Sequence, residues 1–277
     1  PLLNVLSQSS LQDYADCARR FQLRYLERLR YPAVESEPAL ENEKHQQEGE
    51  YFHRLAQQRF LGIPTDKLAR LANTPNLQRW WENFFATDFG FGDYTKNTEF
   101  TLSAPLDSFR LVAKYDLIAI KPGTKAMIFD WKTYRKRPGN EWLATRWQTR
   151  VYRALLVQAG ASLNGGVPFQ PEQIEMTYWF ADFPSEAATF PYNATLFKRD
   201  WDALTKVAQE IRSASDGSTA LATGYPKTDD RQKCSYCPYR GYCDRGVRAG
   251  EGENIETETE AEEMFDINFE QIGEIAF

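Results

Sequence analysis

Residues 109–133 read FRLVAKYDLIAIKPGTKAMIFDWKT. Two apolar, β-branched runs flank the segment Lys121-Pro122-Gly123-Thr124, and this pattern predicts a β-hairpin. Each run carries one aspartate among apolar neighbours, Asp116 in the first run and Asp130 in the second. Adjacent antiparallel strands with a short connection can bring two such carboxylates within a few ångströms of each other.

The second run ends with Asp130-Trp131-Lys132. Side chains alternate between the two faces of a strand, so we expect Asp130 and Lys132 to project together and Trp131 to point the opposite way. Neighbouring carboxylates repel each other and hold a proton between them unless a cation intervenes. A hard divalent ion such as Mg²⁺ or Mn²⁺ suits oxygen ligands, and Lys132 could orient a water molecule or stabilise developing phosphate charge. A salt bridge on an edge strand is the alternative explanation of this pattern.

The rest of the chain reads as a mixture of helices and strands. Apolar residues that recur every three or four positions predict helices over residues 10–30, 41–60, 76–89, 141–160 and 194–214. Apolar and β-branched runs predict strands over residues 94–103, 109–120, 125–132, 173–180 and 187–192. Ser9 and Ser10, followed by Asp13, are typical of a helix N-terminus. A sheet flanked by helices follows, which places the fold in the mixed α/β class.

The composition is that of a soluble globular protein. Of the 277 residues, 42% are hydrophobic and 26% are charged, which is an ordinary balance. No apolar run approaches the roughly 18 residues needed to span a bilayer, and the sequence opens without a signal-peptide pattern. We therefore expect a cytoplasmic protein with no membrane partner.

The net charge of −6 is unevenly distributed. Residues 251–277 hold ten of the 39 acidic side chains and no Lys or Arg, so the preceding 250 residues carry a net charge of +4. We expect a mildly basic domain over residues 1–250 and an acidic linker and tail over 251–277. The apolar residues of 264–277 suit docking on an apolar groove of the domain or of a partner, and a solubilising tail is the alternative.

Basic and aromatic residues alternate after Lys132. They are Tyr134, Arg135, Lys136, Arg137, Trp142, Arg146, Trp147, Arg150, Tyr152 and Arg153. This composition suits a phosphate backbone and unstacked bases, although a solvated helix face would show it too.

Three of the four cysteines lie close together, as Cys234, Cys237 and Cys243. The spacing C-x2-C-x5-C is typical of metal ligands, because a gap of two residues lets both sulfurs face one centre. The fourth ligand would be Cys17, since no histidine lies near the three. A disulfide framework is uncommon in a large cytosolic protein, whereas four thiolates allow either structural Zn²⁺ or an iron–sulfur cluster.

Asp116, Asp130 and Lys132 resemble the core signature of the PD-(D/E)XK nuclease superfamily. Cys17 and the C-terminal cysteines resemble those of its RecB-like branch, which includes the nuclease domain of the AddB subunit of bacterial AddAB and the CRISPR-adaptation exonucleases. The segments Gly49-x3-His53 and Gln148-x3-Tyr152 are similar to two further motifs of this branch. The sequence departs from the pattern at Tyr115, where a proline is typical, and at Ala113, where a glycine is often found.

The resemblance implies a restriction-endonuclease-like fold over residues 1–250, with the two ends joined by a [4Fe–4S] cluster on Cys17, Cys234, Cys237 and Cys243. It implies Mg²⁺ or Mn²⁺ held by His53, Asp116, Asp130 and the backbone carbonyl of Trp131. Lys132 would position the attacking water, and Gln148 and Tyr152 would hold the strand.

The implied activity is that of a metal-dependent nuclease, acting on DNA ends or single strands as an exonuclease in DNA repair, recombination or CRISPR adaptation. The alternative is an iron–sulfur DNA-binding module that serves a partner helicase or integrase and cleaves little by itself. An intact set of His53, Asp130 and Lys132 favours the enzyme, because a module has no need of these residues.

Overall fold

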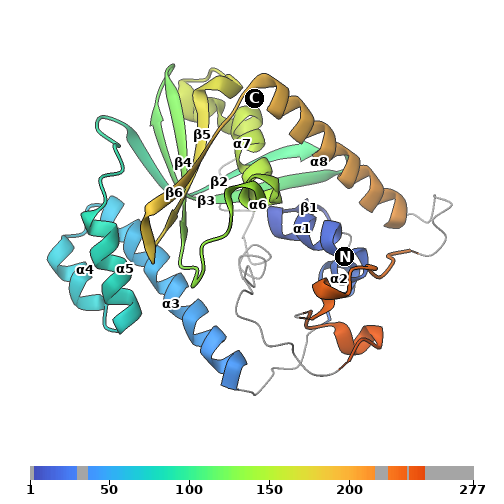
Figure 1. Cartoon of the computed structure of the whole chain (residues 1–277). Coiled ribbons are helices and arrows are strands. Elements are labelled where there is room, and N and C mark those ends of the chain that lie inside the picture. Colours follow the sequence, from blue (N-terminus) through green and yellow to red (C-terminus); the bar gives the residue numbers. More distant parts are fainter. Residues whose placement is uncertain (1–2, 30–36, 216–223, 236, 247–277) are drawn as a thin grey trace.

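The computed structural model describes residues 3–29, 37–215, 224–235 and 237–246. In these residues six strands form one mixed sheet, with helices on both faces (Figure 1). The strands are β1 (Val5–Leu6), β2 (Thr95–Leu106), β3 (Phe109–Lys121), β4 (Lys125–Lys132), β5 (Ile174–Phe180) and β6 (Phe183–Pro191). The α-helices are α1 (Gln8–Asp16), α2 (Ala18–Phe21), α3 (Glu37–Phe60), α4 (Thr65–Leu71), α5 (Pro75–Ala86), α6 (Asn140–Thr145), α7 (Trp147–Ala159) and α8 (Ala194–Ser215).

Short helices complete the architecture. A π-helix, η1 (Gln22–Leu26), follows α2, and the 3-10 helices are η2 (Gly160–Asn164), η3 (Pro171–Gln173), η4 (Arg231–Cys234) and η5 (Arg240–Cys243).

Strand β3 is the hub of the sheet. It pairs in parallel with β1 and antiparallel with β2 and β4. The predicted hairpin between β3 and β4 is confirmed, and its turn contains Gly123 at φ 72°, a left-handed conformation that glycine adopts without steric cost. Strand β5 is parallel to β4, so the chain must cross over between them, and it does so through α6 and α7.

The two faces of the sheet carry separate apolar cores. The first core lies under α1, α7 and α8 and contains Val151 and Leu204, whereas the second lies under α3 and α5 and contains Phe52 and Trp80. On β4, Ile128 belongs to the first core and Trp131 to the second. The predicted alternation along β4 is therefore confirmed.

The alternation along β3 slips at Asp116. Tyr115 and Ile118 both face the first core although they are three positions apart, and Leu117 faces the second core. Asp116 therefore stands where the strand changes from one alternation to the other. The ladder between β3 and β4 stops at the same place, because Leu117 opposite Phe129 is the last pair.

The prediction of one helix over residues 10–30 was wrong. Cys17 interrupts it with an extended backbone at φ −163° and ψ 107°, between α1 and α2. The helix also begins earlier than predicted, since Ser7 is the N-cap of α1 and exchanges hydrogen bonds with Ser10 in a capping box. Asp13 does not take part in that cap, and it pairs with Arg20 at 2.8 Å.

The predicted helix over residues 141–160 is also interrupted. Arg146 has φ −62° and ψ 143°, and it separates α6 from α7. The remaining predicted helices and strands are found with bounds shifted by a few residues, and the two-residue strand β1 was not predicted.

The N- and C-terminal parts of the described chain lie against each other (Figure 1). The backbone N–H of Arg19 donates to the carbonyl of Pro226 at 3.1 Å, and the Tyr239 hydroxyl donates to the carbonyl of Leu29 at 3.0 Å. The predicted linker and tail over 251–277 lie outside the described residues. Among the helices that the structure describes, none combines the length and apolarity required to cross a bilayer.

Candidate active site

Asp116 and Asp130 lie at the end of the β3–β4 ladder. They are the next residues of the register that pairs Leu117 with Phe129, so the hairpin brings the two carboxylates together as predicted. Asp116 is 8% exposed and Asp130 is 1% exposed. Two buried acids side by side are costly unless charges or hydrogen-bond donors compensate them.

His53 and Trp131 compensate Asp116. His53 Nδ1 lies 3.2 Å from Asp116 Oδ1, and the backbone N–H of Trp131 donates to Asp116 Oδ2 at 2.8 Å. Burial acts to raise the pKa of Asp116, but the charge and hydrogen bond of His53 and the N–H of Trp131 outweigh it and hold the pKa below its ordinary value.

Helix α3 carries His53 to this position because it packs closely against the end of β4. A Cβ atom on Gly49 would lie 2.8 Å from Thr133 Oγ1, so any larger residue would force Thr133 or the helix to shift. One turn earlier, His45 Nε2 donates to the carbonyl of Thr133 at 2.7 Å. The Gly49-x3-His53 motif thus has a structural explanation, with the glycine setting the distance between helix and strand and His53 reaching the acid.

Asp130 is compensated less completely. Lys132 Nζ lies 2.9 Å from Asp130 Oδ1, and Gln148 Nε2 donates to Asp130 Oδ2 at 2.7 Å. Burial raises the pKa of Asp130 to about 6, with Lys132 opposing the shift and Asp116 adding to it. Asp130 Oδ1 faces the Lys132 ammonium group, and a carboxylate oxygen has a second lone pair for another partner. This oxygen can accept a further ligand, and a hard cation prefers such oxygens.

Gln148 and Tyr152 lie on the inner side of α7. The Gln148 Oε1 atom accepts a hydrogen bond from the Tyr178 hydroxyl at 3.4 Å. Tyr152 is 1% exposed, and its hydroxyl donates to the carbonyl of Lys114 at 2.7 Å. Gln148 therefore contacts Asp130 of the acid pair, whereas Tyr152 is buried between α7 and β3.

Glu99 is a third acid near this site that the sequence patterns did not single out. It stands on β2 opposite Asp116, because Thr98 pairs with Leu117 and Phe100 with Tyr115. Its backbone is left-handed, at φ 51°, and its carboxylate binds Lys114 Nζ at 2.5 Å. Burial and then the charge of Asp116 raise the pKa of Glu99. An acid inside a strand that is rich in threonine was the only signal.

The predicted basic and aromatic surface is only partly exposed. Trp142 is 45% exposed and stacks with Arg146 at 4.6 Å. Arg150 and Arg153, in contrast, bind the buried carboxylate of Asp200 on α8, at 2.9 Å and 3.7 Å. The prediction of a basic surface is therefore wrong for Arg153, which is buried and cannot reach a phosphate backbone.

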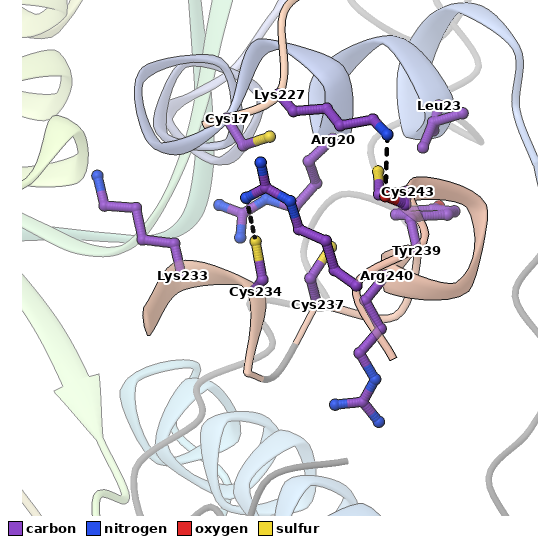
Figure 2. A pocket seen from close by; sticks show the side chains of 11 residues that line it. Cys17, Arg20, Leu23, Lys227, Lys233, Cys234, Cys237, Tyr239, Arg240 and Cys243 are labelled. Carbon is purple, nitrogen blue, oxygen red and sulfur yellow. Dashed lines mark hydrogen bonds between the residues drawn. The ribbon is translucent and has the colours of Figure 1, made fainter. Parts of the chain in front are cut away.

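The four cysteines line one pocket, although Cys17 lies more than two hundred positions from the others (Figure 2). The break after α1 turns Cys17 toward η4 and η5, which carry Cys234 and Cys243. Five basic side chains line the same pocket: Arg20, Lys227, Lys233, Arg240 and Arg245. The Arg245 guanidinium donates to Cys234 Sγ at 3.1 Å. Burial raises the pKa values of Cys237 and Cys243, and a bound metal would reverse that effect by displacing the proton.

Neither site has a finished coordination shell as the side chains stand. Within residues 3–29, 37–215, 224–235 and 237–246, no three His, Cys, Asp or Glu side chains are arranged to hold a metal ion. At the acid pair, the His53 side chain contacts the Asp116 carboxylate, and the Lys132 side chain contacts the Asp130 carboxylate. The donor groups nevertheless suit the predicted metal centres, with oxygen and imidazole groups at one site and four thiols at the other.

Comparisons with known proteins bear on the family of this chain and on its fold. The family model described as "PD-(D/E)XK nuclease superfamily" matches residues 5–97 and 84–244. A crystal structure from Eubacterium rectale, named "Putative exonuclease", has 10% identity and a TM-score of 0.52, covering 93% of this chain and 92% of its own. The crystal structure of SSO0001 has 12% identity and a TM-score of 0.43, covering 90% and 89%. A search of curated protein sequences found no match. The sheet flanked by helices is consistent with a restriction-endonuclease-like fold.

Proposed function

We propose, since this chain belongs to the PD-(D/E)XK nuclease superfamily, that it is a metal-dependent nuclease that hydrolyses phosphodiester bonds of DNA, at ends or in single strands. The observation that carries the proposal is the buried pair of Asp116 and Asp130, with His53 on one acid and Lys132 on the other. A protein gains no stability from two adjacent buried acids, one of which has a raised pKa. Such an arrangement is typical of a functional site.

We assign the metal to His53, Asp116, Asp130 and the backbone carbonyl of Trp131. A bound Mg²⁺ or Mn²⁺ supplies Lewis-acid chemistry, which polarises a phosphoryl oxygen and lowers the pKa of a water molecule. Lys132 supplies a fixed positive charge for the phosphate as negative charge develops on it. Gln148 holds Asp130 in place through its amide, and burial keeps competing water away from the acids.

We further propose that Cys17, Cys234, Cys237 and Cys243 hold a [4Fe–4S] cluster, with Zn²⁺ as the alternative. The basic side chains around the pocket support a thiolate-ligated centre, because such a centre carries net negative charge. Protein purified without oxygen should be brown and contain iron and acid-labile sulfide. Colourless protein with stoichiometric zinc would overturn the cluster and keep the four-cysteine site.

The nuclease is tested by digestion of end-labelled single- and double-stranded DNA with Mg²⁺ and with Mn²⁺. We expect cleavage by the wild type and none by Asp130→Ala or Lys132→Ala, while Lys198→Ala, which alters an exposed lysine of α8, retains it. Near-native cleavage by either site variant would refute the assigned site. Tight DNA binding without cleavage by metal-supplied wild type would favour the alternative, an iron–sulfur module for a partner helicase or integrase.

A further inference from the structure

Helix α7 begins at a contact with α1. The backbone N–H of Trp147, the first residue of α7, donates to Gln12 Oε1 on α1 at 3.3 Å. The N-cap residue, Arg146, makes no side-chain cap of its own. The first N–H groups of a helix have no partner inside the helix. Gln12, which lies on α1, therefore caps the N-terminus of α7 by accepting from Trp147.

The next residue of α7 is Gln148, which reaches the acid pair. Its Nε2 donates to Asp130 Oδ2 at 2.7 Å. Because Gln148 lies in the first turn, the position of its amide depends on how that turn is held. Any shift of the turn moves the donor on Asp130.

The same glutamine, Gln12, is tied to the four-cysteine pocket. Asp16 lies one turn after Gln12 on α1, and the Gln12 side chain is close enough to help lower the pKa of Asp16. Asp16 Oδ1 binds Lys233 Nζ at 3.1 Å, and Lys233 lines the pocket directly before Cys234. Asp16 also directly precedes Cys17. Helix α1 therefore joins two printed contacts, Lys233 with Asp16 near the cysteines and Gln12 with Trp147 next to Gln148.

We propose that Gln12 is a positioning residue that couples the four-cysteine site to the acid pair. A centre bound by the four thiols fixes Cys17 and Cys234, and with them the Lys233–Asp16 pair. Asp16 then orients Gln12, and Gln12 holds the first turn of α7 and the amide of Gln148. The proposal rests on the proposed function, because its effect on rate is read through DNA cleavage. Its structural part is measured independently of activity.

The structural part is tested by amide hydrogen exchange of residues 147–150 in the purified full-length protein with its cysteine centre. Gln12→Leu keeps the side-chain bulk and removes the acceptor, so exchange should become about two- to tenfold faster, which corresponds to one lost hydrogen bond. Lys233→Met removes the link at the cysteine end and should accelerate the same amides by a smaller factor. Gln47→Leu, on the exposed side of α3, is the matched control and should change nothing.

The kinetic part is tested by a double-mutant cycle. Gln12→Leu should lower kcat for DNA cleavage about two- to tenfold with KM unchanged, because Gln12 bonds the backbone of α7 and acts only through Gln148 in this proposal. In the Gln148→Ala background the same substitution should have no further effect, since its influence passes through Gln148. Additive losses, or unchanged amide exchange in Gln12→Leu, would overturn the coupling. A wild type without cleavage would refute the proposed function, whereas the exchange result would still decide whether Gln12 holds α7.

Discussion

Replacing Asp130 by asparagine should make the metal-free protein more stable and inactive. Burial raises the pKa of Asp130 from its ordinary value of 3.8 to about 6. A difference of about two pKa units corresponds to about 3 kcal/mol of cost for the charged form in the folded state. The asparagine side chain would carry no charge and would retain an oxygen for the amide of Gln148. The loss of the ion pair between Lys132 and the carboxylate would offset part of this gain in stability. We therefore expect the free energy of unfolding to rise by about 1–3 kcal/mol above pH 7.

The sign of the pH dependence follows from the raised pKa. The folded protein holds the Asp130 proton more tightly than the unfolded chain does, so this group's contribution to stability is present below about pH 3.8. It is lost as the pH rises through about 6. Asparagine does not titrate. The difference in unfolding free energy between Asp130→Asn and the wild type should therefore be near zero at pH 4 and reach its full value above pH 7.

Urea unfolding at several pH values between 4 and 8, in buffer freed of divalent ions by a chelating resin, measures this difference. Asp202→Asn is the control, because Asp202 is exposed on α8. Added Mg²⁺ or Mn²⁺ should stabilise the wild type and leave Asp130→Asn almost unchanged, since only a bound ion shifts the unfolding equilibrium. A variant that is less stable than the wild type at pH 8, by a margin that does not vary with pH, would refute the assumption that the charge on Asp130 is costly.

Three further predictions address other parts of the chain. Gly49→Ala should lower the free energy of unfolding by about 1–3 kcal/mol and reduce cleavage, because its Cβ meets Thr133 Oγ1 at 2.8 Å. Thr133→Ala should restore the melting temperature and cleavage of this variant. The control Gly139→Ala, whose Cβ would face open space, should change neither. Cys17→Ser should lower the iron and sulfide content and the melting temperature, and unchanged values of both would contradict its role as a ligand. Deletion of residues 251–277, which removes ten acids from the sequence, should tighten single-strand DNA binding at low salt and have little effect at high salt; equal binding at low salt would exclude competition by the tail.

The hairpin and the acid pair were predictable because local patterns specify them. Alternation on β4 places Asp130 and Lys132 on one face, and the short turn at Gly123 sets a register in which Asp116 follows opposite Asp130. The spacing of Gly49 and His53 also lies within one helix. Each of these inferences uses residues that are near one another in sequence, where geometry constrains the outcome.

Other features depend on contacts between distant segments and could not be read from the sequence. Glu99 becomes a neighbour of Asp116 only through the register of β2 on β3. Arg153 looked like a surface residue because nothing in its own helix reveals Asp200 on α8. The cap that Gln12 gives to Trp147 joins two helices far apart in the chain. Pairing of this kind is fixed by packing and not by local preference.

Three of the candidate site residues, Cys17, Asp116 and Gln148, lie at or next to interruptions of the regular patterns, and the interruptions at Cys17 and Arg146 explain why periodicity alone misplaced two helices. A helix that continued through Cys17 would keep its thiol on the cylinder of α1, whereas the extended backbone there turns it toward the cysteine pocket. The break at Arg146 starts a new helix, so that Gln148 enters in a first turn that another helix can cap. At the slip in β3, Asp116 lies beside Asp130 of the neighbouring strand, and the apolar residues on either side of it face both cores. In the two helical segments the apolar spacing continues across the breaks at Cys17 and Arg146, so periodicity alone does not reveal them.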